Sequence, residues 1–346
     1  MEVLFQFLWP AVVAFFMGVF FVGLAIKLFP KWGLLDRPHR YGLKRKPIPY
    51  YGGIAIFAAF LVSVFIFFPL SPQFLGLLVG ATIIVSLGVL DDLFGISPFI
   101  RLAVQFVACL ILVFSGIGIL SINLPFFGSF DLSQPMVAGV MVLSALFTIF
   151  WVMAVLNTMN FVDGIGGLSS GVSFVAGMTI FFLSINPALH ENPETQLGVA
   201  TLAIIIAMIS LAFLLFDFPA PRILMGDGGS TFLGFMIAVL AIFSGGKIAT
   251  AFLVLGIPIL DMIWVVLRRV WSGQKFWKGD LKHLHHRLLD LGFSQRRVVL
   301  LYLSITAVLG FSATMLVSSQ QKFFMLIALV FLMLLLATAI VFVPRR

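Results

Sequence analysis

The chain has 346 residues, of which 62% are hydrophobic and only 10% are charged. This composition excludes an ordinary soluble domain, in which about a quarter of the residues are charged, and it indicates an integral membrane protein. The formal net charge of +8 requires no nucleic-acid partner, because the basic residues are distributed as membrane proteins distribute them.

Eleven apolar runs predict a polytopic, all-α integral membrane protein with about eleven transmembrane helices. The runs cover residues 4–29, 50–68, 74–90, 99–120, 137–156, 165–185, 197–216, 230–244, 248–268, 297–317 and 323–343. The first run has no small-residue cleavage site before its basic flank, which favours a retained helix over a signal peptide. No soluble domain or linker interrupts the pattern, so we expect one transmembrane domain over residues 1–346.

Lysine and arginine residues predict the orientation of these helices, because short basic loops remain in the cytoplasm. Most of the 21 basic residues fall in loops of one side, chiefly after the first and the ninth run. Only Lys247 and Lys322 fall in loops of the other side. We therefore expect the N-terminus outside and the C-terminus in the cytoplasm. The basic inner face suits anionic headgroups or phosphorylated substrates.

Four polar clusters lie in the predicted cytoplasmic loops, and the densest covers residues 157–171 with the sequence NTMNFVDGIGGLSSG. Asn157, Asn160 and Asp163 recur every three residues, so they share a face if the preceding helix continues this far. The glycines that follow, beginning with Gly164, allow a sharp turn or a close approach of the backbone to a ligand. A polar loop with a helix-capping aspartate is the alternative interpretation.

A second cluster begins with two adjacent carboxylates, Asp91 and Asp92, at the inner end of the third run. Arg101 and Gln105 follow at the start of the fourth run. Unless a cation or a donor compensates, the two carboxylates repel each other and one is pushed toward protonation. Such a pair suits a metal site or a general base. A hydrated helix end is the alternative, although negative charge there opposes the helix dipole.

A third cluster, MGDGGS at residues 225–230, directly precedes an apolar run. Backbone N–H groups and the Asp227 carboxylate at a helix N-terminus suit a phosphate or a phosphate-bound cation. Asp227 or Ser230 acting as a simple N-cap is the alternative.

The fourth cluster is the cytoplasmic loop of residues 272–297, which contains the sequence HLHHR from His283 to Arg287. Four leucines fit one stripe of an amphipathic helix on the membrane surface, and His283 and His286 would share a face. These leucines are Leu281, Leu284, Leu288 and Leu289. Zinc is an alternative for the three histidines, but no cysteine or carboxylate lies at ligand spacing. The adjacent Lys282 and Arg287 favour a cluster of donors for phosphate oxygens.

Together these motifs resemble the polyprenyl-phosphate N-acetylhexosamine-1-phosphate transferases over essentially the whole chain. The resemblance rests on DDxxG at Asp91, NxxNxVDGIGGL at Asn157, MGDGGS at Met225 and HLHHRLLDLG at His283. Three consecutive histidines are typical of the related translocase that loads muramoyl-pentapeptide, whereas HLHHR is similar to the branch that acts on UDP-N-acetylglucosamine. The expected location is the bacterial inner membrane, with several passes through the lipid bilayer.

The resemblance implies a reaction in which a UDP-sugar and undecaprenyl phosphate give undecaprenyl-diphospho-sugar and UMP. N-acetylglucosamine (GlcNAc) is the expected sugar, and the reaction would be the first membrane step of a cell-surface glycan pathway such as lipopolysaccharide or teichoic acid synthesis. Another UDP-N-acetylhexosamine or UDP-MurNAc-pentapeptide stays open as the donor. A homodimer is compatible with the resemblance.

The resemblance also implies roles for individual residues. Mg²⁺, or Mn²⁺ in its place, is expected on Asp227 with Asn160 as a second ligand, since Mg²⁺ takes few protein oxygens and leaves sites for phosphates. Asp91 would deprotonate or orient the lipid phosphate, and Asp92 would support the metal or the nucleotide. Asp163, the third expected catalytic carboxylate, and Asn157 would contact the nucleotide-sugar. The phosphates would be neutralised by Lys46, Arg101, His283, His285, His286 and Arg287.

Three residues depart from the family pattern and affect the expected ligand preference more than the chemistry. Asp217 stands where asparagine is usual, Leu224 where phenylalanine is frequent, and Tyr50 where a basic residue is frequent.

A proton-coupled membrane transporter is the alternative from another class, because intramembrane carboxylates and broken helices are its hallmarks. The acids of this chain lie at predicted inner helix ends, and no pair of repeats is visible. Asp261, after Pro258 in the ninth run, is the one acid that fits a carrier. We interpret it as a packing or helix-orienting group near the site.

Overall fold

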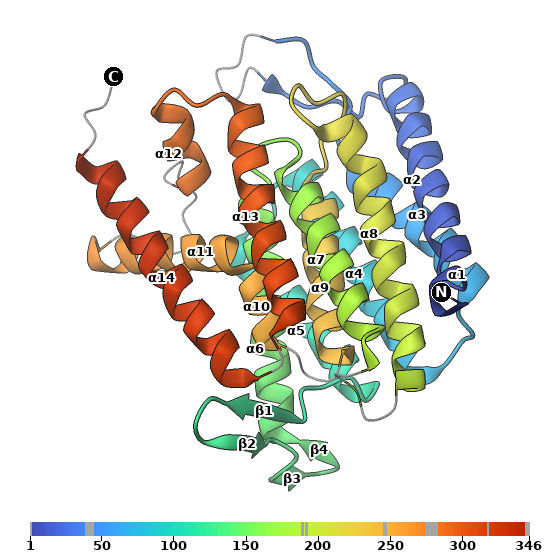
Figure 1. The fold of residues 1–346 in the computed structure, drawn as a ribbon. Coiled ribbons are helices and arrows are strands. Elements are labelled where there is room, and N and C mark those ends of the chain that lie inside the picture. Colours follow the sequence, from blue (N-terminus) through green and yellow to red (C-terminus); the bar gives the residue numbers. More distant parts are fainter. Residues whose placement is uncertain are drawn as a thin grey trace.

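The computed structural model describes residues 2–38, 45–187, 190, 193–244, 248–273, 283–316 and 318–342. Helices make up most of this part of the chain (Figure 1). Those of the first half are α1 (Glu2–Phe5), α2 (Leu8–Leu28), α3 (Gly52–Phe67), α4 (Pro72–Phe94), α5 (Pro98–Phe114) and α6 (Val142–Val162). Those of the second half are α7 (Leu168–Ser184), η3 (Pro193–Gln196), α8 (Leu197–Asp217), α9 (Asp227–Phe243), α10 (Ile248–Val254), α11 (Gly256–Trp271), α12 (Leu284–Asp290), α13 (Gln295–Met315) and α14 (Ser319–Phe342).

The chain is a helical membrane protein. Five helices of the described part are long and apolar enough to cross a bilayer, namely α2, α4, α6, α8 with its preceding turn, and α13. A sixth span results if α10 and α11 are counted as one. The helices α3, α5, α7 and α9 and most of α14 are apolar but shorter. Since about 20 residues cross a bilayer without tilt or thinning, the count of eleven spans stays a prediction.

Helix α9 forms the centre of the bundle. It packs against α3, α4, α6 and α7, and every residue from Gly228 to Ile242 is buried. A helix that is apolar on all sides is stable only when neighbours cover all of it. The buried indole of Trp151 on α6 donates to the carbonyl of Ala238 at 3.0 Å, which ties α6 to α9. The N-terminal residue of α9, Asp227, is therefore held firmly at one end of the bundle.

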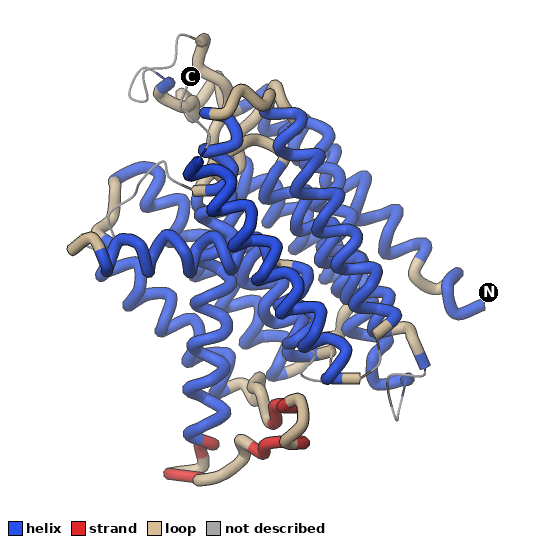
Figure 2. The backbone as a smooth tube through the Cα atoms, turned by 60° about the vertical axis from the view of Figure 1, so that its left-hand side comes forward, coloured by secondary structure: helices blue, strands red, loops and turns tan. Residues whose placement is uncertain are grey.

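Two short hairpins at the opposite end interrupt the all-α pattern (Figure 2). Strand β1 (Ser121–Leu124) pairs with β2 (Gly128–Asp131), and β3 (Met136–Val137) pairs with β4 (Val140–Met141), both antiparallel. Ala138 and Gly139 have positive φ angles of 49° and 79° at the second turn. A helix cannot contain that backbone conformation. The start of the predicted run 137–156 is therefore wrong, and the helix begins at Val142.

The run 248–268 does not form the single span that its apolar character predicts. It is broken into α10 and α11, which meet at an angle of 79°, and α11 lies across the bundle in Figure 1. A Cβ on Gly256 would lie 2.2 Å from the Leu329 Cδ2 atom, so glycine permits this contact with α14. Pro258 lies in the first turn of α11. The first N–H groups of a helix have no acceptor within it, so the N–H that proline lacks costs no helical hydrogen bond here.

Candidate active site

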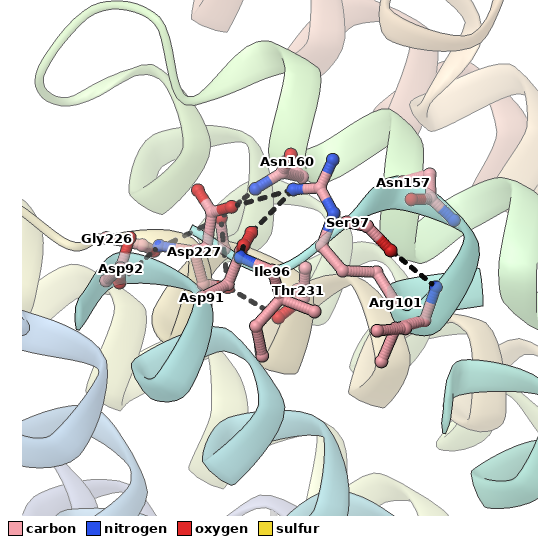
Figure 3. A network of polar contacts seen from close by, with 12 residues as sticks. Asp91, Asp92, Ile96, Ser97, Arg101, Asn157, Asn160, Gly226, Asp227 and Thr231 are labelled. Atoms are coloured by element: carbon pink, nitrogen blue, oxygen red, sulfur yellow. Dashed lines mark hydrogen bonds and ion pairs between the residues drawn. The ribbon is translucent and has the colours of Figure 1, made fainter. Parts of the chain in front are cut away.

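Four helix ends bring together five of the residues that the sequence predicts for the site (Figure 3). Asp91 lies in the last turn of α4, and Arg101 lies in the first turn of α5. Asn157 and Asn160 lie in the last turns of α6, and Asp227 is the first residue of α9. Because α6 continues to Val162, the expectation of one helix face is confirmed for Asn157 and Asn160, whereas Asp163 is the C-cap residue that follows the helix.

Arg101 joins two of the carboxylates. Its Nη1 atom lies 2.7 Å from Asp91 Oδ2 and 3.3 Å from Asp227 Oδ2. The second oxygen of Asp91, Oδ1, accepts a hydrogen bond from the Ile96 N–H at 2.6 Å. Both oxygens of Asp91 thus have donors, and the guanidinium offsets part of the repulsion between Asp91 and Asp227.

Asp92 holds the beginning of α9 from the end of α4. Its Oδ2 atom accepts from the Asp227 N–H at 3.0 Å, and its Oδ1 atom accepts from the Tyr50 hydroxyl at 2.9 Å. This supplies an acceptor for one of the free N–H groups of a helix N-terminus. Neither Asp227 nor Ser230 is the N-cap that was considered from the sequence, because Gly226 occupies that position.

Tyr50 belongs to the site, although the sequence suggests only a departure from the family pattern. Burial, followed by the carboxylates of Asp92 and Asp227, raises the pKa of Tyr50 well above its usual value, so the phenol remains a donor. Its place two residues before the pair Gly52 and Gly53 is the signal that could have identified it. A Cβ on Gly53 would lie 2.2 Å from the backbone nitrogen of Gly229, so this glycine brings the segment against α9.

The two asparagines of α6 have different hydrogen-bond partners. The Asn160 amide donates to Ser230 Oγ at 3.2 Å and also hydrogen-bonds the Asp227 carboxylate. Asn157 pairs with the buried Gln105, since its Nδ2 atom donates to Gln105 Oε1 at 2.9 Å. Asn160 is therefore the one placed beside Asp227, and Asn157 lines the neighbouring wall.

Asp163 lies where negative charge is concentrated. Burial, followed by the carboxylates of Asp217, Asp227 and Asp92, raises the pKa of Asp163 well above its usual value. Asp217 is 1% exposed, and its Oδ2 atom accepts from the Gly167 N–H at 2.7 Å and from a serine hydroxyl. The departure at Asp217 therefore fixes the glycine-rich loop, and its carboxylate is turned into the fold instead of toward a ligand.

The pocket beside these groups suits a hard cation. The residues that line it are Asp91, Arg101, Asn157, Asn160 and Asp227, together with Gln105, Thr231 and apolar residues. Carboxylate and amide oxygens are the donors that Mg²⁺ takes, and Mg²⁺ commonly keeps several waters and substrate phosphates as its other ligands. No group of three or more histidine, cysteine, aspartate or glutamate side chains in the described ranges is arranged to hold a metal alone.

The predicted helix in this loop is present as α12, with Leu284, Leu288 and Leu289 packed toward the core, but the histidines lie differently from the prediction. Helix α12 begins at Leu284, after His283, and Leu281 lies outside the described residues. The His283 ring stacks on the His285 ring at a centroid distance of 5.7 Å and an angle of 5°. His286 lies 4.3 Å from His285. The expectation that His283 and His286 share a helix face is therefore wrong, and the three rings follow one another.

His285 connects this motif to the glycine-rich loop. A Cβ on Gly164 would lie 2.4 Å from His285 Nε2, so only glycine leaves room for the ring. Burial, followed by His286 and His283, holds the pKa of His285 well below its usual value. This shift favours the neutral form of the buried ring, which packs against the glycine-rich loop. Lys46, by contrast, is exposed, and its side chain takes no part in the contacts described above.

Comparisons with known proteins decide the family. The profile of glycosyl transferase family 4 matches residues 74–245. The undecaprenyl-phosphate alpha-N-acetylglucosaminyl 1-phosphate transferase of Escherichia coli K12 is 31% identical over 304 residues, which are 86% of this chain and 80% of that protein. The chain belongs to this family. The expected resemblance to the polyprenyl-phosphate N-acetylhexosamine-1-phosphate transferases is confirmed.

Two further relatives differ in the lipid that their names give. The probable undecaprenyl-phosphate N-acetylglucosaminyl 1-phosphate transferase of Bacillus subtilis is 29% identical over 86% of the chain and 80% of that protein. The decaprenyl-phosphate N-acetylglucosaminephosphotransferase of Mycobacterium tuberculosis H37Rv is 28% identical over 85% of the chain and 78% of that protein. The family profile covers Asp91, Asn160 and Asp227 and ends before the histidine motif.

Proposed function

We propose that the chain transfers GlcNAc-1-phosphate from UDP-GlcNAc to a polyprenyl phosphate, with undecaprenyl phosphate as the expected acceptor. An oxygen of the lipid phosphate forms a bond to the β-phosphorus, and the bond from that phosphorus to the bridging oxygen breaks as UMP leaves. The single observation that carries this proposal is the convergence of Asp91, Arg101, Asn160 and Asp227 at one pocket in a helical membrane protein. The names of the relatives support the same sugar and the same class of lipid.

Charge neutralisation and positioning are the main tasks, because one phosphoanhydride replaces another. Mg²⁺, with Mn²⁺ as the alternative, would neutralise the diphosphate, and Asp227 and Asn160 would hold it. The carboxylate concentration around Asp163 supports a cation at this place. Arg101 neutralises a phosphate oxygen, while Asn157 and Asp163 contact the nucleotide-sugar.

Asp91 and Asp92 position other groups in this account. Asp91 holds Arg101 at 2.7 Å, so it orients the guanidinium toward the lipid phosphate. A base at this position is not required, since a phosphate monoester is already largely ionised near neutral pH. Asp92 holds the first turn of α9.

An apolar pocket between α11, α12 and α14 suits the prenyl chain. Apart from Asp261 and Arg287, the residues that line it are apolar: Leu260, Ile263, Trp264, Leu267, Leu284, Val330, Met333 and Leu334. Arg287 contributes the positive charge, which a phosphate-bearing lipid requires. Leu284 and Arg287 of α12 line this pocket, and His283 directly precedes α12. A lipid bound here therefore has its phosphate near the histidine motif.

We further infer eleven spans, an outer N-terminus, a cytoplasmic site and a location in a bacterial inner membrane. The basic loops support this orientation. The transporter alternative has no support from the relatives, whose names describe transferases.

The test measures UMP release by the purified, detergent-solubilised chain with undecaprenyl phosphate and Mg²⁺. UDP-GlcNAc is offered beside UDP-GalNAc and UDP-MurNAc-pentapeptide. Release with UDP-GlcNAc that EDTA and Asp227→Ala both abolish supports the proposal. Asp131→Ala, on the exposed hairpin strand β2, is the matched control and retains activity. The absence of UMP with every donor contradicts the proposal, and release with only another donor changes the sugar.

A further inference from the structure

Asp261 on α11 binds the start of the histidine motif with both carboxylate oxygens. Its Oδ2 atom lies 3.0 Å from His283 Nδ1, and its Oδ1 atom accepts from the Leu284 N–H at 2.9 Å. Asp261 is 8% exposed and His283 is 6% exposed. Side-chain bonds of this kind are stronger when little water competes, so the carboxylate fixes both the backbone and the ring.

The contact with Asp261 selects one tautomer of His283. A carboxylate is an acceptor, so Nδ1 carries the proton that it donates, and Nε2 is the nitrogen left for another partner. Two more rings restrict the imidazole, since Phe161 lies 5.5 Å and His285 lies 5.7 Å from its centroid. His283 is thus held by Asp261 on α11 and by Phe161 on α6.

The break between α10 and α11 is what brings Asp261 to this place. Asp261 lies about 8 Å along α11 from Gly256, at about 1.5 Å per residue. A continuous helix would carry it in the direction of α10, at 79° to its observed path. The Thr158 hydroxyl lies 3.2 Å from the Met262 sulfur, which joins the broken helix to α6 close to the site.

We propose that Asp261 is a positioning residue for the transfer reaction: it holds the His283 ring by Nδ1–H, so that Nε2 faces the substrates and the protonated ring donates its Nε2–H to a phosphate oxygen. The inference rests on the proposed function, because it assigns His283 to the same reaction. The competing role is purely structural: Asp261 also accepts from the first N–H of α12 and would stabilise that helix even if His283 took no part.

A double-mutant cycle separates the two roles. Asp261→Asn, His283→Gln and the double variant are compared with the wild type by kcat and KM for UMP release. Asp261→Asn is expected to lower kcat about 10- to 100-fold, the usual effect of removing a carboxylate that orients a functional histidine. The double variant is expected to be no slower than His283→Gln, since Asp261 acts only through that ring. Asp290→Asn, exposed at the end of α12, is the matched control.

The outcomes distinguish the inference from the function on which it rests. If the wild type releases UMP and the two losses multiply, Asp261 acts independently of His283 and the inference is overturned. If the wild type releases no UMP, the proposed function fails and the inference fails with it. The thermal unfolding midpoint of each variant checks folding, and Asp261→Glu takes the place of Asp261→Asn in the cycle if the latter does not fold.

Discussion

Asp227 is held in two ways, by its side chain and by its backbone. Arg101 contacts the carboxylate at 3.3 Å, and Asp92 accepts from the N–H at 3.0 Å. The contact of Arg101 with Asp91 is shorter, at 2.7 Å. A substrate phosphate that enters the pocket can therefore replace Asp227 as a partner of Arg101 while Asp91 keeps the guanidinium in place. The hydrogen bond from the Asp227 N–H to Asp92 is unaffected by that exchange and keeps both residues in place.

Tyr50→Phe tests the support that Asp92 receives. The change removes the only side-chain donor described for Asp92 Oδ1, and a partly buried acceptor without a partner costs about 1–3 kcal/mol. We expect kcat for UMP release to fall about tenfold, equivalent to about 1.4 kcal/mol, with KM for UDP-GlcNAc changed less than twofold. Steady-state kinetics of the purified variant measures both.

Tyr51→Phe is the matched control for this change. Tyr51 is a neighbouring buried tyrosine, and no hydrogen bond of its hydroxyl is among those of the described residues. Its kcat should equal that of the wild type. Equal activity of Tyr50→Phe and the wild type would show that Asp92 needs no support from the phenol.

Glycines set how closely the helices approach around the site. A Cβ on Gly88 of α4 would lie 2.4 Å from the Gly228 Cα atom, in the first turn of α9. The two backbones therefore touch directly beside Asp91 and Asp227. Backbone atoms cannot move aside as the end of a flexible side chain can, so this contact fixes the distance between the two helix ends.

Gly88→Ala is expected to separate α4 from α9 and to reverse the usual effect of alanine in a helix. Alanine ordinarily stabilises a helix interior by about 0.5–1 kcal/mol relative to glycine. At Gly88 we expect a lower thermal unfolding midpoint and at least a tenfold loss of UMP release. Calorimetry and the release assay measure the two effects.

Gly23→Ala on α2 provides the comparison, because a Cβ there meets nothing within 4 Å. Its activity should remain that of the wild type, and its stability should stay equal or rise. A Gly88→Ala variant that behaves like Gly23→Ala would contradict the close approach of α4 and α9.

The elements that the sequence predicts well are those whose signal is local. The periodicity of Asn157 and Asn160 lies within one helix, and MGDGGS stands directly before α9. The bond between Tyr50 and Asp92, in contrast, joins residues that are distant in the chain, and periodicity carries no information about it. The break before Gly256 lies where α14 packs against the chain, since a Cβ on Gly256 would lie 2.2 Å from Leu329 Cδ2. The apolar pattern carries no sign of this distant neighbour and predicts one continuous helix.

The whole molecule has two different ends. The loops that carry the four polar clusters lie at one end of the bundle, and the two hairpins lie at the other (Figures 1 and 2). Lysine and arginine residues are concentrated in the loops of the first end. A membrane protein retains such loops in the cytoplasm, which is where a nucleotide-sugar is available.

Cysteine labelling tests this orientation. In a Cys109→Ala background, Ser129→Cys lies on exposed strand β2 and Ser272→Cys lies in the exposed turn after α11. A membrane-impermeant maleimide should label Ser129→Cys in cells whose inner membrane is intact, and it should label Ser272→Cys only after that membrane is permeabilised. The reverse pattern would place the site outside.

The lipid product of the purified chain tests the central claim most directly. Mass spectrometry is applied to the lipid formed from UDP-GlcNAc, undecaprenyl phosphate and Mg²⁺, and the released nucleotide is identified beside it. Phosphosugar transfer by the pocket of Asp91, Arg101, Asn160 and Asp227 predicts a diphosphate-linked GlcNAc lipid together with UMP. A monophosphate-linked sugar with UDP, or a lipid that remains unchanged, would contradict it.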